Sequence, residues 1–139
     1  MTSLLLHASC VAIGARGVLI IGASGTGKSA LALQLIAYGA QLIADDQTQI
    51  SLQDQQLIAS CPTQLSGMIE ARGVGLLHST PQTSAIISLV VDLDQTEMQR
   101  LPPKRITTLL GRQLPLVLGA ESNHFPASVL CYLKGTRLE

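Results

Sequence analysis

Eight residues near the start of the chain constrain its fold more than any other feature. Residues 22–29 read Gly-Ala-Ser-Gly-Thr-Gly-Lys-Ser, which satisfies the pattern G-x-x-x-x-G-K-[ST] in full. A short apolar run, residues 18–21, precedes the pattern, and residues 28–37, rich in helix formers and without Gly or Pro, begin at its lysine. Such a loop binds phosphate when it joins a strand to a helix. We therefore predict an α/β protein with a nucleotide or phosphate site on this loop.

Each part of the loop has a physical task. The glycines allow a tight turn whose backbone N–H groups converge on phosphate oxygens, and the helix N-terminus adds about half a positive charge. Lys28 is predicted to contact the β- and γ-phosphates, and the Ser29 hydroxyl to ligate Mg²⁺. A glycine-rich turn that only caps a helix is the alternative. The predicted nucleotide-binding residues are Gly22, Ala23, Ser24, Gly25, Thr26, Gly27, Lys28 and Ser29.

Composition excludes several other classes. A length of 139 residues predicts one domain, over residues 1–139. Nine Lys and Arg balance nine Asp and Glu, which argues against nucleic-acid binding through a basic surface and against a polybasic membrane anchor. No signal peptide or apolar run of membrane-spanning length is recognisable. The three cysteines are widely spaced, so we expect reduced, mostly buried thiols in a soluble cytoplasmic protein.

The rest of the pattern consists mainly of short strands and turns. Residues 84–93 form a nearly continuous apolar run that predicts a buried strand, and residues 94–104 read as a loop. Residues 125–133 fit either a helix or a strand. The predicted hairpins join residues 11–13 to 18–21, 49–52 to 56–60, and 106–110 to 114–118.

Two pairs of acidic residues could complete a phosphate site. Asp45 and Asp46 end a short predicted strand, residues 41–44, and Asp92 and Asp94 end the apolar run. Carboxylates at the end of a neighbouring strand can hold Mg²⁺ or accept a proton from a nucleophile. Successive side chains of an extended segment point to opposite faces, so only one of Asp45 and Asp46 need face the phosphates. Solvated turn carboxylates are the alternative for each pair.

Three further ionisable residues are candidates for the same site: Glu70, Arg72 and His7. Glu70 and Arg72 lie within an apolar frame interrupted by glycines, and in a strand they would share a face. They fit either a surface salt pair or a metal ligand beside an arginine near a transferred phosphoryl group. His7 precedes the first predicted strand, and its residue type alone fits a structural role better than a catalytic one.

Together these residues resemble the catalytic domain of bacterial HPr kinase/phosphorylase, in the short form found in some proteobacteria. The resemblance rests on His7, on the loop at residues 22–29, on Leu-Ile-Ala-Asp-Asp at residues 42–46, and on Ile-Glu-Ala-Arg-Gly-Val-Gly-Leu-Leu at residues 69–77, which is similar to the family's E-x-R-G-x-G signature. It implies a P-loop α/β domain of the phosphoenolpyruvate-carboxykinase-like kind, with a mixed β-sheet.

The resemblance also implies an activity. It implies an ATP-dependent kinase that transfers the γ-phosphoryl group to a serine of HPr, the phosphocarrier of the sugar phosphotransferase system. ATP and Mg²⁺ are then the expected cofactors, and an HPr-like protein is the expected partner. By the same resemblance, Lys28 contacts the phosphates, Ser29 and Glu70 hold Mg²⁺, Asp46 accepts the proton, Asp45 supports Asp46, and His7 is an active-site histidine. Arg100 matches the family's later catalytic arginine in type but not in its neighbours.

Several positions depart from the family pattern. Ala30 stands where the family usually has Glu, Ala23 where an acid is common, and His78 where Asn is expected. Residues 111–139 lack the recognisable elements that the family associates with phosphorolysis and assembly, so phosphorolysis and a homo-oligomer stay open. Two other functions also stay open: an ATP-binding regulatory protein that has lost phosphoryl transfer, and a small-metabolite kinase.

Overall fold

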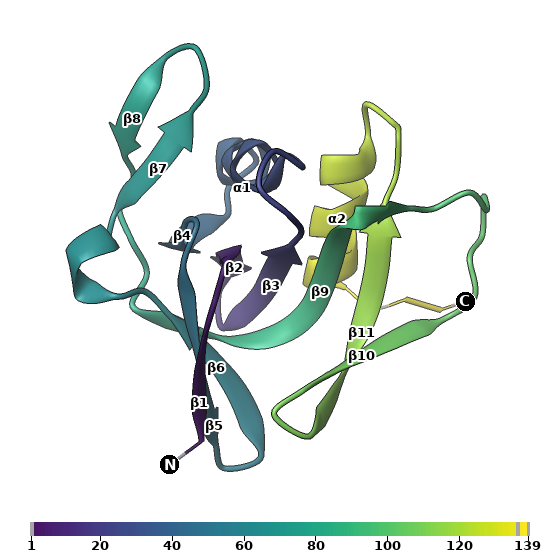
Figure 1. The fold of residues 1–139 in the computed structure, drawn as a ribbon. Helices are drawn as coiled ribbons and strands as arrows, with labels where there is room; N and C mark the ends of the chain where they lie inside the picture. Colours follow the sequence, from purple (N-terminus) through teal and green to yellow (C-terminus); the bar gives the residue numbers. More distant parts are fainter. Residues whose placement is uncertain (1, 136, 139) are drawn as a thin grey trace.

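A computed structural model describes residues 2–135, 137 and 138, and shows a mixed α/β fold (Figure 1). Within these residues the chain forms eleven strands, two α-helices and one short 3₁₀ helix. In chain order they are β1 (Ser3–Leu6), β2 (Ala8–Ile13), β3 (Arg16–Ile21), α1 (Lys28–Ala37), β4 (Gln41–Ala44), β5 (Thr48–Gln53), β6 (Gln56–Ser60), η1 (Thr63–Leu65), β7 (Met68–Ala71), β8 (Gly75–His78), β9 (Ser84–Thr96), β10 (Arg105–Leu109), β11 (Arg112–Gly119) and α2 (Phe125–Lys134).

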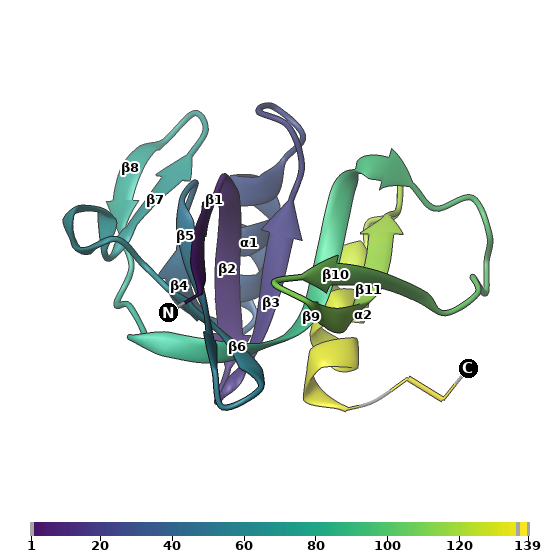
Figure 2. The ribbon, with the colours of Figure 1, turned by 60° about the horizontal axis from the view of Figure 1, so that its bottom comes forward.

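Nine of these strands join one sheet. Its order is β1-β5-β6-β9-β3-β2-β4, with β11 paired to β9 and β10 to β11. Strand β9 runs parallel to β3 and to β11, whereas the hairpins β2–β3, β5–β6 and β10–β11 are antiparallel. The sheet is therefore mixed, as the resemblance implied. Strands β7 and β8 form a separate ribbon that projects from one end of the molecule (Figure 2).

The three predicted hairpins are present. Strands β2, β3, β5 and β11 are longer than the sequence indicated, β6 has the predicted bounds, and β10 is shifted by one residue. The apolar run predicted as residues 84–93 continues to Thr96, so the expectation that residues 94–96 belong to a loop is wrong. Pairing explains the difference, because Gly119 of β11 still faces Thr96 across the sheet. Residues 125–133, left open between helix and strand, lie in helix α2, whose second residue is a proline. Proline is well tolerated in the first turn of a helix, where its missing N–H has no partner to lose.

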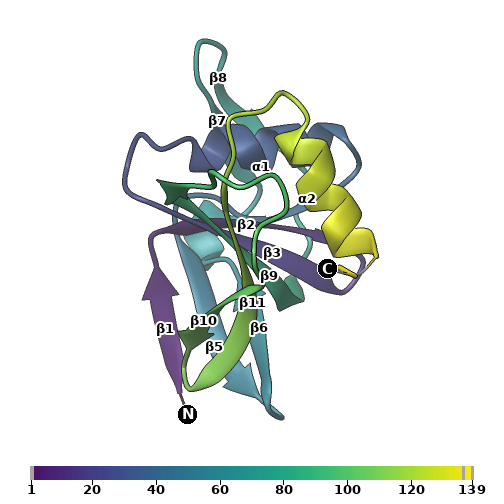
Figure 3. The same ribbon diagram turned by 90° about the vertical axis from the view of Figure 1, so that its right-hand side faces the viewer.

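The sheet buries both of its faces. One apolar cluster packs α1 and α2 against β3 and β9, and both helices lie on the same side of the sheet (Figure 3). The second cluster contains strand residues only, including Leu19, Ile43, Ile50 and Val90. Here the sheet buries this face by curving over itself, so that its own strands pack together as two facing sheets would. The curved sheet thus provides one half of the core and the two helices cover the other.

Two segments of the chain bend at the same place. Strands β1 and β2 are nearly continuous, and so are β4 and β5; β1 pairs with β5, and β2 with β4. The first segment bends at His7 and the second at residues 45–47. Because the two bends face each other, residues far apart in sequence meet there.

The cysteines differ in their surroundings. All three are free; Cys10 is buried, Cys61 is partly buried and Cys131 is exposed. The expectation of mostly buried thiols is therefore wrong for Cys131, because its position on α2 faces away from the sheet. No helix in the described part of the chain is both long enough and apolar enough to cross a membrane.

We predict that thiol reagents distinguish these cysteines. Burial raises the pKa of the Cys10 thiol to about 12, so at pH 8 only about one molecule in ten thousand carries the reactive thiolate. Treatment of the native protein with iodoacetamide, followed by mass spectrometry, should label Cys131 and leave Cys10 unlabelled. Unfolding in urea should expose all three. Equal labelling of Cys10 and Cys131 in the native protein would contradict this assignment.

Candidate active site

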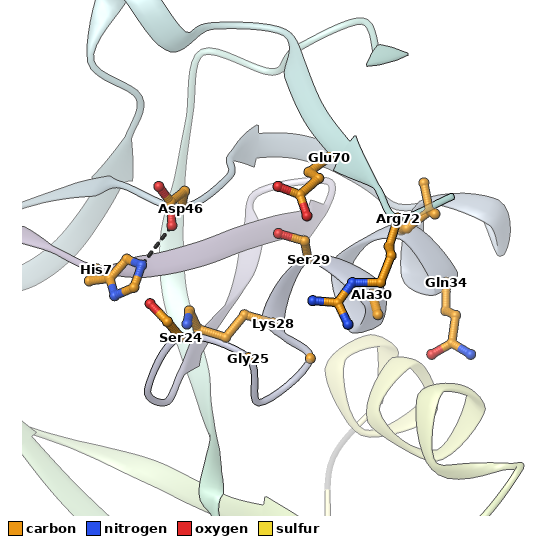
Figure 4. A pocket seen from close by; sticks show the side chains of 12 residues that line it. His7, Ser24, Gly25, Lys28, Ser29, Ala30, Gln34, Asp46, Glu70 and Arg72 are labelled. Atoms are coloured by element: carbon orange, nitrogen blue, oxygen red, sulfur yellow. Dashed lines mark hydrogen bonds and ion pairs between the residues drawn. The ribbon is translucent and has the colours of Figure 1, made fainter. Parts of the chain in front are cut away.

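A cavity of about 600 Å³ opens above the loop formed by residues 22–27. The loop and the first turns of α1 form its floor, the two bends form one wall, and β7 with its following turn forms another (Figure 4). Its lining residues are His7, Ser24, Gly25, Gly27, Lys28, Ser29, Ala30, Leu33, Gln34, Asp46, Glu70 and Arg72.

The loop depends on backbone conformations that favour glycine. Gly22 has a φ of 149°, and a Cβ atom at this position would lie 2.6 Å from Thr26 Oγ1. Gly27, directly before α1, has a φ of 102°. The Thr26 hydroxyl donates a hydrogen bond to the Ala23 carbonyl at 2.7 Å, which closes the loop on itself. These contacts hold the loop in one shape before any ligand arrives.

Lys28 crosses this loop with its side chain. Only 6% of the residue is exposed, and Nζ donates to the carbonyl oxygens of Gly22 at 2.8 Å and Ala23 at 3.1 Å. Both acceptors are neutral, and the ion pairs found among the described residues do not include Lys28. A largely buried cation without a counter-charge favours an anionic ligand.

Asp45 joins three elements through one carboxylate. Its Oδ1 accepts hydrogen bonds from the Ser9 hydroxyl of β2 and the Ser29 hydroxyl of α1, both at 2.7 Å. Its Oδ2 accepts the backbone N–H of Glu70 in β7 at 3.1 Å. Asp45 is 8% exposed, so these three donors replace the water that a buried carboxylate would otherwise need. The carboxylate fixes the helix start and the β7 ribbon relative to the sheet.

Asp46 lies at the bend itself. Its φ is 69°, a left-handed conformation that Asp tolerates better than most residues. The Asp46 N–H donates to Ser9 Oγ at 3.3 Å, and its carbonyl accepts the Ala8 N–H at 3.1 Å. The carboxylates of Asp45 and Asp46 point apart, as strand alternation suggested. The physical reason is different, because β4 ends at Ala44 and the left-handed turn redirects Asp46 into the cavity.

His7 and Asp46 form a hydrogen-bonded pair. His7 Nε2 lies 2.6 Å from Asp46 Oδ1, and the two side chains remain 47% and 66% exposed. Figure 4 shows this contact at the end of the cavity beside Lys28. The imidazole occupies one oxygen of the carboxylate and leaves Asp46 Oδ2 without a recorded partner in the described part of the chain. A reactive proton could therefore be accepted by that oxygen.

Glu70 and Arg72 line the same cavity without pairing. The expectation that they share a strand face is wrong, because β7 ends at Ala71 and Arg72 lies in the following turn. Among residues 2–135, 137 and 138, no ion pair between them was found. Their charges are thus available to a ligand rather than committed to each other.

The remaining predicted residues are placed differently. Gly22 and Ala23 turn their carbonyls to Lys28 and do not line the cavity, and the Ala23 N–H donates to Asp94 Oδ1 at 2.8 Å. Asp94, one of the alternative acids, therefore holds the loop by its backbone from outside the cavity. Arg100 lines a separate cavity of about 250 Å³ near α2, so the structure does not bring it to this site.

Sequence reasoning missed Ser9. Its side chain is fully buried and contacts both members of the acidic pair, as donor to Asp45 and acceptor from the Asp46 N–H. A single serine in an apolar strand gives no local sign of this role. Only the pairing of β2 with β4 brings it opposite the two acids.

The residues fit a magnesium site that is shared with a phosphate ligand. Within the described ranges, no group of three His, Cys, Asp or Glu side chains could hold a metal ion. The Ser29 hydroxyl directs its hydrogen to Asp45, which leaves its oxygen lone pairs free, and the Glu70 carboxylate lines the same cavity. Mg²⁺ usually takes one or two protein ligands and completes its shell with phosphate oxygens and water.

We expect Asp45→Asn to lower the free energy of unfolding by about 2 kcal/mol, because at least one of the three donors to a buried acceptor loses its partner. Whichever way the new amide turns, its NH₂ faces either the Glu70 N–H or the two serine hydroxyls. Urea unfolding followed by circular dichroism measures the loss.

Asp54→Asn is the matched control. Asp54 lies exposed in the β5–β6 turn with a φ of 49°, where asparagine is equally suitable. The urea concentration at the midpoint of unfolding should be the same for Asp54→Asn as for the unchanged protein. Equal losses for the two variants would show that the Asp45 contacts do not stabilise the fold.

Comparisons with known proteins agree on one family. The model of the HPr Serine kinase C-terminal domain matches residues 1–113. The HPr kinase/phosphorylase of Levilactobacillus brevis is 31% identical over 91% of this chain and 49% of its own length. That of Clostridium botulinum strain Eklund 17B is 45% identical over 54% of this chain and 25% of its own. The chain thus spans about half the length of the first of these relatives.

A solved structure supports the same assignment over almost the whole chain. The Hpr(Ser) kinase/phosphatase from Coxiella burnetii superposes with a TM-score of 0.79 at 26% identity, covering 94% of this chain and 88% of that one. Sequence, fold and the arrangement of the loop with the acidic pair lead to one conclusion. The chain belongs to the family of the HPr serine kinase C-terminal domain.

Proposed function

We propose that this chain is an ATP-dependent kinase that transfers the γ-phosphoryl group to a serine hydroxyl of an HPr-like phosphocarrier protein in the cytoplasm. One observation carries the proposal: Lys28, a cation on a phosphate-type loop, and Asp46, a carboxylate whose Oδ2 has no hydrogen-bond partner among the described residues, face the same cavity. The substrate class is supported by the names of its relatives, HPr kinase/phosphorylase and Hpr(Ser) kinase/phosphatase. We further propose residues 1–139 as a single kinase domain.

In this proposal the loop and Lys28 bind the triphosphate. The Lys28 ammonium exchanges neutral carbonyl acceptors for phosphate oxygens, which stabilises charge that develops on the transferred group. Arg72, which lines the cavity without an acidic partner among the described residues, adds a second positive charge beside the same group. A Mg²⁺ ion held by Ser29 and Glu70 would neutralise further phosphate charge when bound.

Asp46 then acts as the proton acceptor. As the serine oxygen bonds to the γ-phosphorus and the bond from phosphorus to the β-phosphate oxygen breaks, the serine proton passes to Asp46 Oδ2. His7, on the other oxygen at 2.6 Å, holds the carboxylate in place for this transfer. Run in reverse with inorganic phosphate as acceptor, the same groups would support phosphorolysis of phosphoserine.

We predict that Lys28→Ala abolishes phosphorylation of HPr and that Asp46→Asn lowers kcat by about 10²–10⁴. Purified HPr incubated with the protein, ATP and Mg²⁺ should gain the mass of one phosphoryl group, located by mass spectrometry on a serine. Chelation of Mg²⁺ should stop the reaction. Asp54→Asn, exposed in a distant turn, should match the unchanged protein.

Other outcomes separate the remaining functions. ATP binding that depends on Lys28, with no phosphorylated product, would indicate a nucleotide-dependent regulatory protein instead. Phosphate transfer to a member of a panel of hydroxyl-bearing metabolites in preference to HPr would indicate a metabolite kinase. The same product yield from the unchanged protein and from Lys28→Ala would contradict any transfer on this loop.

A further inference from the structure

A cavity other than the one that Arg100 lines, here called the second cavity, lies beside the loop on the side away from the acidic pair. It has a volume of about 440 Å³, within the range of small-molecule clefts. Helix α1 lies between the β7–β8 ribbon and α2 in both Figure 1 and Figure 2, and this cavity lies on the α2 side. It shares Gly27, Ala30 and Gln34 with the first cavity, so the two meet over the first turns of α1.

If the proposed function holds, the geometry of phosphoryl transfer indicates which part of ATP extends toward this cavity. The attacking and leaving oxygens lie roughly in line through the transferred phosphorus. Asp46 and His7 mark the acceptor end of the first cavity, so the diphosphate that leaves must extend the other way, past Ser29 and Ala30. That path leads to the shared wall and into the second cavity. The nucleoside is attached to the far end of the diphosphate, so it lies in the second cavity.

The far wall of this cavity comes from the segment that enters α2. This segment is held by its own hydrogen bonds: the Ser122 hydroxyl lies 2.7 Å from His124 Nδ1 and accepts the His124 N–H at 3.2 Å. The Phe125 N–H donates to the Ser122 carbonyl at 3.2 Å. The segment therefore has a defined shape, although it lies beyond residue 113, where the family model ends.

Two side chains of this wall suit a nucleoside base. Phe125 is the only phenylalanine in the chain and Asn123 the only asparagine. Phe125 is half-buried and packs against the core, which fixes its ring beside the cavity. Asn123 is exposed, and no hydrogen bond to its side chain was found in the described part of the chain. An aromatic face stacks on any base, while an amide reads a base edge.

We propose that the second cavity holds the nucleoside of ATP, with Phe125 against the face of the base and Asn123 on its edge. An asparagine amide offers one acceptor and one donor, which match the N6 amino group and N7 of adenine. Guanine presents two acceptors, O6 and N7, at the same edge. The site therefore selects ATP over GTP.

Calorimetric titration with ATP, GTP and inorganic tripolyphosphate, in the presence of Mg²⁺, tests this proposal. Asn123→Ala should weaken ATP binding about tenfold and remove the preference over GTP. Phe125→Leu, which keeps apolar contact with the core, should weaken both nucleotides by a similar factor. Neither variant should change tripolyphosphate binding, because that ligand has no nucleoside. Gln113→Ala, an exposed amide outside both cavities, is the control, and thermal unfolding checks that each variant folds.

The outcomes separate this inference from the function on which it rests. If Asn123→Ala binds ATP and GTP as the unchanged protein does, or weakens tripolyphosphate as much as ATP, the nucleoside lies elsewhere. If the unchanged protein binds neither ATP nor tripolyphosphate, or binds them equally well after Lys28→Ala, the proposed function itself fails. If Asn123→Ala weakens the binding of ATP but not of tripolyphosphate, and both ligands still require Lys28, the results support the nucleoside site and the proposed function together.

Discussion

The carboxylate of Asp45 is the contact on which the site depends. It is largely buried, yet it accepts hydrogen bonds from β2, from the first turn of α1 and from the backbone of β7. Hydrogen bonds to a charged, buried acceptor are among the stronger ones in proteins, and an unmet charge there would be costly. Sheet, helix and ribbon are therefore held at fixed distances around one atom group, and the cavity is the space between them.

This arrangement divides work between two adjacent acids. Asp45 uses both oxygens for the protein and has none left for a ligand. Asp46 shares one oxygen with His7 and turns the rest of its carboxylate to the cavity. The left-handed backbone at Asp46 makes this division possible, because it turns the Asp46 carboxylate into the cavity directly after β4 has ended at Ala44.

The mixed sheet places residues that support the loop region on both of its sides. Strand β9, parallel to β3, carries Asp94 beyond the end of β3, where it receives a backbone N–H from the loop. Antiparallel β2 brings Ser9 to the other side of the same region. Asp94 therefore holds the loop directly, and Ser9 holds the start of α1 indirectly, through the Asp45 carboxylate that also accepts the Ser29 hydroxyl. Neither contact follows from the loop motif. The segment before α2 forms one wall of the second cavity, and it lies beyond residues 1–113, the part of the chain that the family model matches.

Local sequence was sufficient for the strand–loop–helix unit, the three hairpins and the acidic strand end, because turn residues, helix formers and apolar runs act over a few neighbouring positions. Ser9, the turn at Arg72 and the separation of Arg100 from the site were not accessible in the same way. Each depends on which strands pair and where the chain bends, and these are settled by burying two apolar faces of one curved sheet. The residue types that can bind and transfer phosphate were thus determined by the sequence alone. Which carboxylate oxygens of Asp45 and Asp46 are hydrogen-bonded within the described residues was decided only when distant strands met, since a hydrogen bond needs both partners in place.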